Sequence, residues 1–446
     1  MLLARFARSG VINYAAVTTD SSAYFSSGIT YAPNGANLAG ILSERTARGL
    51  DESSPYVAVQ MQGNPGREPM SERYDAIVVG LGGMGSAALA HLASRGRRVL
   101  GLEQYHPAHA LGSSHGGSRI IRKAYYEDPA YVPLVLRAYE LWQRLEEQTG
   151  ARLLLRTGGL MAGYEGCEIL EGSLRSARAH GLEYEVMSAA DMRRRFPVLR
   201  PRPDEAALYE PDAGILFPEQ CVLAHLQAAV AAGAEARFGL RVSSWKVEAG
   251  GASVTAGGDK ILCDRLLLCA GPWLGQVAAG MTLPLQAERN IVHWFDPISD
   301  GSALGPSELP VYVLERRGIP IFYGIPLLPD QGIKAAFHYS QQTTTPDEVN
   351  RDVSGPEVAA MREALSAWMP DAAGAWRRSS VCMYTNTPDK HFLIGIYARY
   401  PQVIIAGGFS GHGFKFCPVI GEILADLALD GSTAHQIDLF APERVW

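Results

Sequence analysis

The chain has 446 residues, of which 47% are hydrophobic, and this length predicts two packed domains rather than one. Its net charge of -6 comes from interspersed acids and bases, without the basic block that a nucleic-acid or anionic-membrane partner would require. No apolar run reaches the length of about 18 residues that would span a membrane. The six cysteines form no C-x-x-C pair, which argues against a disulfide framework or a zinc site and favours a reducing, cytoplasmic location.

Residues 1–70 differ in composition from the rest of the chain. They are rich in Ser, Ala, Gly and Thr and show no clear amphipathic period. We expect a disordered extension or a false start, because "MSERYDAIVVG" from Met70 is typical of a natural start. A targeting segment is the alternative, since "MLLARFARSG" carries two arginines and no acid precedes Asp20.

The next segment has the pattern of a dinucleotide-binding βαβ unit. A continuous apolar run, Ala76 to Val79, predicts a parallel strand buried on both faces. The motif G-x-G-x-x-G follows at Gly80, Gly82 and Gly85. A helix and a second strand, 97–102, lead to Glu103, whose carboxylate is placed to accept from ribose hydroxyls. The glycines let the backbone approach a pyrophosphate at the helix N-terminus. The alternative is a tight turn with a surface glutamate, and the motif alone does not distinguish NAD from FAD.

A polar loop with Ser113, Ser114 and His115 precedes two arginines, Arg119 and Arg122. At a spacing of three, the arginines would share a helical face. Their apolar neighbours predict partial burial, and a buried arginine needs an anion, although arginines in such a position are usually solvated. An amphipathic helix is expected from about 128 to 149, with Pro133 in its first turn and Gly150 after its end.

Further elements are expected in the second half of the chain: helices at 218–232 and 356–368, and strands at 235–242, 265–273 and 403–406. Lys334 and His338, four residues apart in a β-type segment, would lie on one face of a strand. A lysine in such a strand costs several kcal/mol unless it is paired or neutralised. His338 as a hydrogen-bonded core histidine is the competing interpretation.

The C-terminal part contains a cysteine and a lysine in unusual settings. Cys382 lies in an apolar, aromatic stretch, where a small core side chain is the simple explanation. Gly411 and Gly413 form a turn that would let the backbone approach a ring, and a helix is expected to begin near 413. Lys415 in its first turn opposes the helix dipole and therefore calls for a nearby anion, unless it is an ordinary surface lysine.

Five stretches, in this order, carry a family likeness: "GLGGMG", "GSSHGGSRIIRKAY", "GIKAAFHY", "CMYTNTPDKHF" and "GFSGHGFKF". From about Tyr74 to its end, the chain resembles the monomeric sarcosine oxidase and N-methyltryptophan oxidase family. These are FAD enzymes that oxidise N-methyl amino acids. The resemblance implies an α/β (mixed α+β) fold, with a Rossmann-like FAD-binding domain (71–155, 215–285 and 380–446) and a second, mixed-sheet substrate domain (156–214 and 286–379).

The resemblance also implies residue roles. Cys382 would form a thioether to the 8-methyl carbon of FAD, with Tyr384 on the same strand face. Arg122 and Lys415 would hold the substrate carboxylate, although the N1–C2 carbonyl locus of reduced flavin is a second anion open to Lys415. Lys334 would lie near flavin N5 through water and promote the reaction with oxygen. The catalytic group comprises Lys334, His338, Arg119, Tyr384 and Tyr323. The expected FAD contacts are Gly80, Gly82, Met84, Gly85, Glu103, Ser113, Ser114, His115, Arg119, Val242, Cys382, Gly411, Gly413 and Lys415.

The implied reaction oxidises a secondary amino acid such as sarcosine to an imine, which hydrolyses to formaldehyde and a primary amino acid while O2 becomes hydrogen peroxide. Alternatives are an oxidase of N-methyl-L-tryptophan or of a cyclic imino acid, a dehydrogenase, and a non-catalytic FAD-binding subunit. A metal site from His338, His391 and His412 lacks ligand spacing and is rejected. We expect a monomer without nucleic-acid or membrane partners.

Overall fold

The computed structural model describes residues 73–445, so the predicted extension, residues 1–70, lies outside the described residues. Among the helices of this described part, none is both long and apolar enough to cross a membrane. The same residues contain no group of three or more His, Cys, Asp or Glu side chains that could hold a metal ion.

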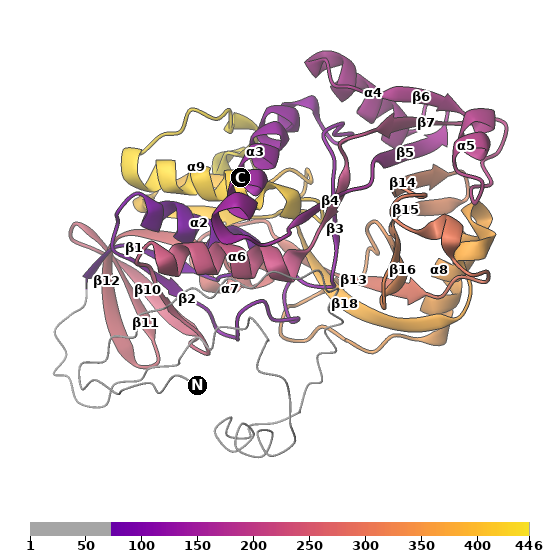
Figure 1. The fold of residues 1–446 in the computed structure, drawn as a ribbon. Helices are drawn as coiled ribbons and strands as arrows, with labels where there is room; N and C mark the ends of the chain where they lie inside the picture. The colour runs from indigo at the N-terminus through magenta and orange to yellow at the C-terminus, as the bar shows by residue number, and fades with distance from the viewer. Residues whose placement is uncertain (1–72, 446) are drawn as a thin grey trace, which may run out of the picture. The chain divides into compact units, whose positions relative to one another are not determined.

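The first sheet of the described part has eight strands, and the glycine-rich turn connects its strand β1 to the helix α2 (Figure 1). β1 pairs in parallel with β2 on one side and β12 on the other, β2 pairs with β9, and β12 pairs with β20. β10, β11 and β19 add antiparallel pairings. The bounds are β1 Arg73–Val79, β2 Val99–Leu102, β9 Glu235–Arg237, β10 Val242–Glu248, β11 Gly251–Ala256, β12 Asp259–Leu268, β19 Leu393–Tyr397 and β20 Tyr400–Gly407.

β1 is buried on both faces, which confirms the interpretation of its apolar run. Ala76 and Val78 pack into a core shared with the helices, whereas Ile77 and Val79 pack into the core on the opposite face. The helical layer consists of α2 (Gly83–Ser94), α6 (Pro218–Ala231) and α9 (Cys417–Asp430), which lie side by side in Figure 1, with α3 (Val132–Thr149) packed against α6 and α9.

The second sheet has nine strands and is mixed, because β14 and β5 pair in parallel while its other pairings are antiparallel. Its bounds are β5 Gly159–Tyr164, β6 Glu185–Ser188, β7 Glu205–Glu210, β13 Gln286–Phe295, β14 Val311–Arg316, β15 Ile319–Leu328, β16 Gly332–Phe337, β17 Thr343–Thr344 and β18 Trp376–Asn386. α8 (Gly355–Trp368) packs against β15 and β16 and buries Met361, Leu365 and Trp368 in the core of this sheet.

A small sheet of β3 (Arg119–Ile121), β8 (Gly214–Leu216) and β4 (Leu154–Arg156) completes the strands of the described part. The remaining α-helices in this part are α4 Glu168–His180, α5 Ala189–Arg195 and α7 Leu274–Val277. Short 3-10 helices lie at Pro129–Tyr131, Gly271–Trp273, Ser302–Leu304, Pro370–Ala372, Phe414–Phe416, Asp438–Phe440 and Pro442–Val445.

Several predicted elements are confirmed and others are wrong. The helices expected at 128–149, 218–232 and 356–368 are present as α3, α6 and α8, with Gly150 ending α3 at a φ of 72°. The strand expected at 235–242 is instead two strands, β9 and β10, which lie at different places in the sheet because the chain turns at Gly239. The strand expected at 265–273 ends at Leu268, where the chain enters the 3-10 turn containing Pro272.

Two local expectations also fail near the site. Arg119 belongs to strand β3, so it shares no helical face with Arg122. Lys415 lies in the 3-10 turn Phe414–Phe416, and α9 begins only at Cys417, followed by Pro418. The division into an FAD-binding and a substrate-binding domain stays a prediction, and its boundary at residue 380 falls inside β18, which pairs along its length with β13 of the second sheet.

Candidate active site

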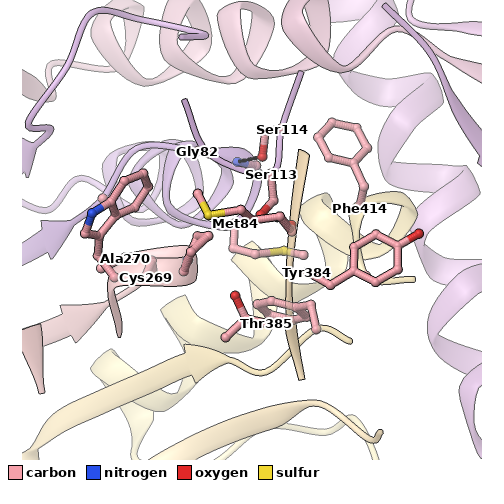
Figure 2. A pocket seen from close by; sticks show the side chains of 18 of the residues that line it. Gly82, Met84, Ser113, Ser114, Cys269, Ala270, Tyr384, Thr385 and Phe414 are labelled. Carbon is pink, nitrogen blue, oxygen red and sulfur yellow. Dashed lines mark hydrogen bonds between the residues drawn. The ribbon is translucent and has the colours of Figure 1, made fainter. Parts of the chain in front are cut away.

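A continuous cavity is lined from both large sheets and from the glycine-rich turn (Figure 2). Of the predicted site residues, it is lined by Gly80, Gly82, Met84, Glu103, Ser113, Ser114, Arg119, Arg122, Val242, Tyr323, His338, Cys382, Tyr384, Gly411, Gly413 and Lys415. Gly85, His115 and Lys334 lie outside this set of lining residues. Gly85 and His115 are buried, and Lys334 lies behind a loop described below.

The glycine-rich turn needs glycine for two separate reasons. Gly80 has a φ of +88°, and a Cβ there would lie 2.6 Å from the backbone oxygen of Cys269. A Cβ on Gly85 would lie 1.8 Å from the backbone oxygen of Gly80, so Gly85 permits close helix–strand contact rather than lining the cavity. The Gly83 N–H donates to Ser114 Oγ at 3.0 Å (Figure 2), and α2 begins without a side-chain cap. This uncapped helix N-terminus at the cavity suits a phosphate.

Glu103 lies buried at the end of β2. Its carboxylate accepts from the N–H groups of Leu81 at 2.8 Å and Tyr105 at 3.0 Å, and His109 lies 3.5 Å away. Burial would raise the pKa of Glu103, but the hydrogen bonds from His109 and these backbone groups outweigh it and lower the pKa. The cavity therefore has an ionised carboxylate at the end of β2, hydrogen-bonded to the N–H of Leu81 in the glycine-rich turn.

Arg119 connects the polar loop to Cys382. Its guanidinium donates to the backbone oxygens of Ser118 and Ser113 at 2.8 Å each, and to Cys382 Sγ at 3.6 Å. The Ser113 hydroxyl donates to the backbone oxygen of Met383 at 2.6 Å, which joins the same loop to β18. Cys382 is 4% exposed, so its sulfur is enclosed by this contact and by the strand pairing of β18 with β13.

Lys334 is 1% exposed and points into the loop rather than into the cavity. Its Nζ donates to the backbone oxygens of Gly116 and Ser118 at 2.8 Å each and to Ser118 Oγ at 3.1 Å. Burial and the nearby Arg119 charge hold the pKa of Lys334 well below its usual value. The expected pairing of a lysine in this apolar strand is thus made with backbone oxygens.

Arg122 is buried and paired with Glu127. Its NH2 group donates to both Glu127 oxygens, at 2.9 and 2.7 Å, and its guanidinium carbon lies 4.4 Å from the ring centres of Tyr125 and Tyr126. Burial alone would lower the pKa of Arg122, but Glu127 raises it above its usual value. Burial alone would raise the pKa of Glu127, but Arg122 lowers it to about 2. Both groups are therefore charged inside the cavity wall.

Lys415 is the second buried cation at this end of the cavity. Its Nζ donates to the backbone oxygen of His412 at 2.6 Å and to Tyr125 Oη at 3.3 Å. Burial and the Arg122 charge lower the pKa of Lys415 to about 7, although Glu127 opposes them. An additional anion at this position would restore the lysine to its charged form.

His338 lies just after β16, among aromatic side chains. Its Nδ1 is 3.4 Å from Tyr384 Oη, and its Nε2 is buried without a hydrogen-bond partner in the described residues. Burial lowers the pKa of His338 to about 3, so the imidazole is neutral. The ring centres of Tyr323 and Tyr384 lie 6.4 and 5.8 Å from that of His338.

The two glycines of the C-terminal turn make room for aromatic side chains of the chain itself. A Cβ on Gly411, whose φ is +83°, would lie 2.2 Å from the Tyr384 ring, and a Cβ on Gly413 would lie 2.6 Å from Phe409. These contacts within the chain explain why glycine is needed at both positions, without invoking a cofactor ring bound against the turn.

Sequence reasoning missed several lining residues, including Glu127, Tyr126, Asn290, Val292 and Val313. Glu127 had a signal, since it lies five residues after Arg122 in a segment already singled out. Tyr126 precedes it in the same segment, whereas Asn290, Val292 and Val313 come from β13 and β14, which carry no distinguishing motif.

The parallel sheet, the uncapped helix and the buried Glu103 fit a dinucleotide, and the cavity continues to a chamber with two buried cations and an aromatic wall. Fold and site together define a dinucleotide-dependent α/β enzyme whose cavity also contains two buried cations.

Comparison with known proteins agrees with this class. Residues 75–427 match the family FAD dependent oxidoreductase. The chain is 46% identical to a monomeric sarcosine oxidase of Streptomyces avermitilis, over 84% of this chain and 99% of that protein. It is 31% identical to an N-methyl-L-tryptophan oxidase of Salmonella arizonae, over 83% and 99%. The solved structure of NikD, described as an unusual amino acid oxidase, has a TM-score of 0.72 at 25% identity, over 83% of this chain and 98% of that one. The chain belongs to the monomeric sarcosine oxidase and N-methyltryptophan oxidase family of FAD dependent oxidoreductases.

Proposed function

We propose that this protein catalyses the FAD-dependent oxidation of a secondary amino acid such as sarcosine, with O2 as the electron acceptor. The observation that carries the proposal is the pair of buried cations, Arg122 and Lys415, in the wall of the cavity that Cys382 and Tyr384 also line. The similarity to monomeric sarcosine oxidases supports the same substrate class and favours a monomer.

Arg122 and Lys415 bind the substrate carboxylate. Both are almost excluded from water, so a carboxylate that enters meets cations whose attraction is weakly screened. The carboxylate must share Arg122 with Glu127, which already occupies the guanidinium. Anchoring at this end fixes the reacting C–H bond relative to the rest of the cavity.

His338, Tyr323 and Tyr384 surround the amine. The apolar and aromatic wall disfavours a charged ammonium group, so the substrate reacts as the neutral amine. The unpartnered Nε2 of the neutral His338 is available to accept the amine N–H. Bound FAD would supply the acceptor for a hydride equivalent from the carbon next to nitrogen and the donor of two electrons to O2.

Overall, the amine loses two electrons and two protons, and O2 takes them up to become hydrogen peroxide. Water then adds to the C=N bond and releases formaldehyde and the primary amino acid. Cys382 Sγ would hold the cofactor through a thioether to its 8-methyl carbon, and the charge of Lys334 would stabilise negative charge as oxygen is reduced. Arg119, Ser113 and Ser114 hold this part of the chain in place through the contacts described above.

A peroxide assay with sarcosine, N-methyl-L-tryptophan and L-pipecolate tests the proposal. Sarcosine should give the highest kcat/KM, and N-methylated amines without a carboxylate should be poor substrates. An Arg122→Lys variant should bind sarcosine more weakly, because lysine does not replace a planar guanidinium. Flavin-loaded protein that produces no peroxide from any of the three would make the non-catalytic FAD-binding subunit the better interpretation, and a preference for either larger substrate would shift the assignment to that substrate.

A further inference from the structure

One loop, Gly116–Ser118, lies between two opposite charges. The Lys334 ammonium donates to the carbonyl oxygens of Gly116 and Ser118. On the other side, Glu219 Oε1 accepts from the N–H groups of Gly116 at 2.7 Å and Gly117 at 3.1 Å. The peptide group between Gly116 and Gly117 is therefore hydrogen-bonded at both ends, to the carboxylate through its N–H and to the ammonium through its C=O. Such a chain polarises each bond in it.

The backbone of this loop is shaped to receive the carboxylate. Gly116 and Gly117 have φ values of +94° and +75°, a conformation that glycine adopts without strain. Successive N–H groups in such a turn form a concave site for an anion. Glu219 is in the first turn of α6, directly after Pro218, where the helix dipole also favours a negative charge.

Lys334 has a pKa that burial, Arg119 and Arg378 lower and that Glu219 and Cys382 raise. It interacts with Arg119 of β3, Arg378 and the Cys382 thiol of β18, His115 of the loop, and the Trp294 ring of β13. Glu219 is the carboxylate that acts on Lys334, Arg119, Arg378 and His115 alike. It lies outside the set of residues that line the cavity.

We propose that Glu219 is a positioning residue for the reaction with oxygen: through the Gly116–Gly117 peptide it holds Lys334 in place and in its protonated form. The inference rests on the proposed role of Lys334. It assigns to Glu219 no contact with substrate and no part in flavin reduction.

Glu219→Gln tests the proposal because glutamine keeps an acceptor oxygen but removes the charge. Stopped-flow reoxidation by O2 should be slower at neutral pH, and the pH at which half the rate is lost should fall by about 1 unit or more, as for removal of a nearby opposite charge. Anaerobic reduction by sarcosine should be unchanged. Glu219→Asp, which keeps the charge, should show a smaller shift, and Glu140→Gln, on the exposed side of α3, should show none.

Two further measurements separate the possible failures. In a Lys334→Met background, Glu219→Gln should slow reoxidation no further. In 15N-lysine-labelled protein, the Lys334 Nζ signal is assigned as the one that disappears in Lys334→Met. That signal should titrate at lower pH in Glu219→Gln than in the parent protein. This measurement does not depend on turnover. If Lys334→Met reoxidises at the parent rate, the proposed role of Lys334 fails and the inference with it. If Lys334→Met is slow but Glu219→Gln keeps the parent pH profile and Nζ midpoint, only the role of Glu219 is overturned.

Discussion

Glu127 holds the Arg122 guanidinium through both of its carboxylate oxygens, at 2.9 and 2.7 Å from one nitrogen, inside the wall of the proposed substrate chamber. The ion pair keeps a buried arginine charged before substrate arrives. Under the proposed function, a substrate carboxylate would compete with this carboxylate of the protein for the same donor.

This competition predicts that Glu127→Gln tightens the binding of carboxylate inhibitors. A hydrogen bond to a charged group contributes about 1.5–3 kcal/mol, so the dissociation constant should fall by about tenfold or more. Titration of the flavin absorbance with a non-reacting carboxylate at pH 6, where Lys415 is charged, measures this. The exposed Glu140→Gln is the matched control. Unchanged or weaker binding in Glu127→Gln would show that Glu127 does not compete.

The lowered pKa of Lys415 predicts that the binding of carboxylate inhibitors depends on pH. Because its pKa is lowered to about 7 without ligand, the lysine is cationic below pH 7 and neutral above it. A bound carboxylate raises that pKa, so affinity should fall as pH rises through 7 and continue to fall until the pKa of the complex. Lys415→Met should weaken binding by about 2–5 kcal/mol at pH 6 and remove the inflection near 7. A parent protein whose inhibitor constant is flat from pH 6 to 9 would contradict this.

Cys382 is predicted to hold the flavin covalently. Acid-precipitated parent protein should remain yellow, whereas Cys382→Ser should release its flavin to the supernatant. Cys269→Ser is the control, because Cys269 also lines the cavity and is buried. A yellow supernatant from the parent protein would remove the thioether from the proposal.

Gly85 is predicted to be essential for packing rather than for contact with the cofactor. A Cβ there would overlap the backbone oxygen of Gly80, and forced overpacking typically costs about 1–3 kcal/mol or more. Gly85→Ala should lower the midpoint of thermal unfolding, read by circular dichroism. Gly275→Ala should leave it nearly unchanged, because a Cβ at Gly275 has no atom within 4 Å. Equal midpoints for the two variants would refute the packing argument.

Much of the local structure could be predicted from the sequence. The strand Ala76 to Val79, the glycine turn and the helices α3, α6 and α8 depend on apolar runs, proline, glycine and periodicity within a few residues, and these signals are local. Motifs and the family resemblance together marked the candidate site residues, and 16 of those positions line one cavity, from Gly80 to Lys415.

Contacts between distant segments could not be predicted in this way. The sequence identified Lys334 as a lysine in need of a partner, but only the folded chain brings it to the oxygens of Gly116 and Ser118, and brings Glu219 to the other side of the same loop. Likewise, Arg119 lies in a strand rather than a helix because β3 pairs with β8. Tertiary structure decides such matters because hydrogen bonding and burial depend on segments about a hundred or more residues apart, which leave no periodic trace in either segment.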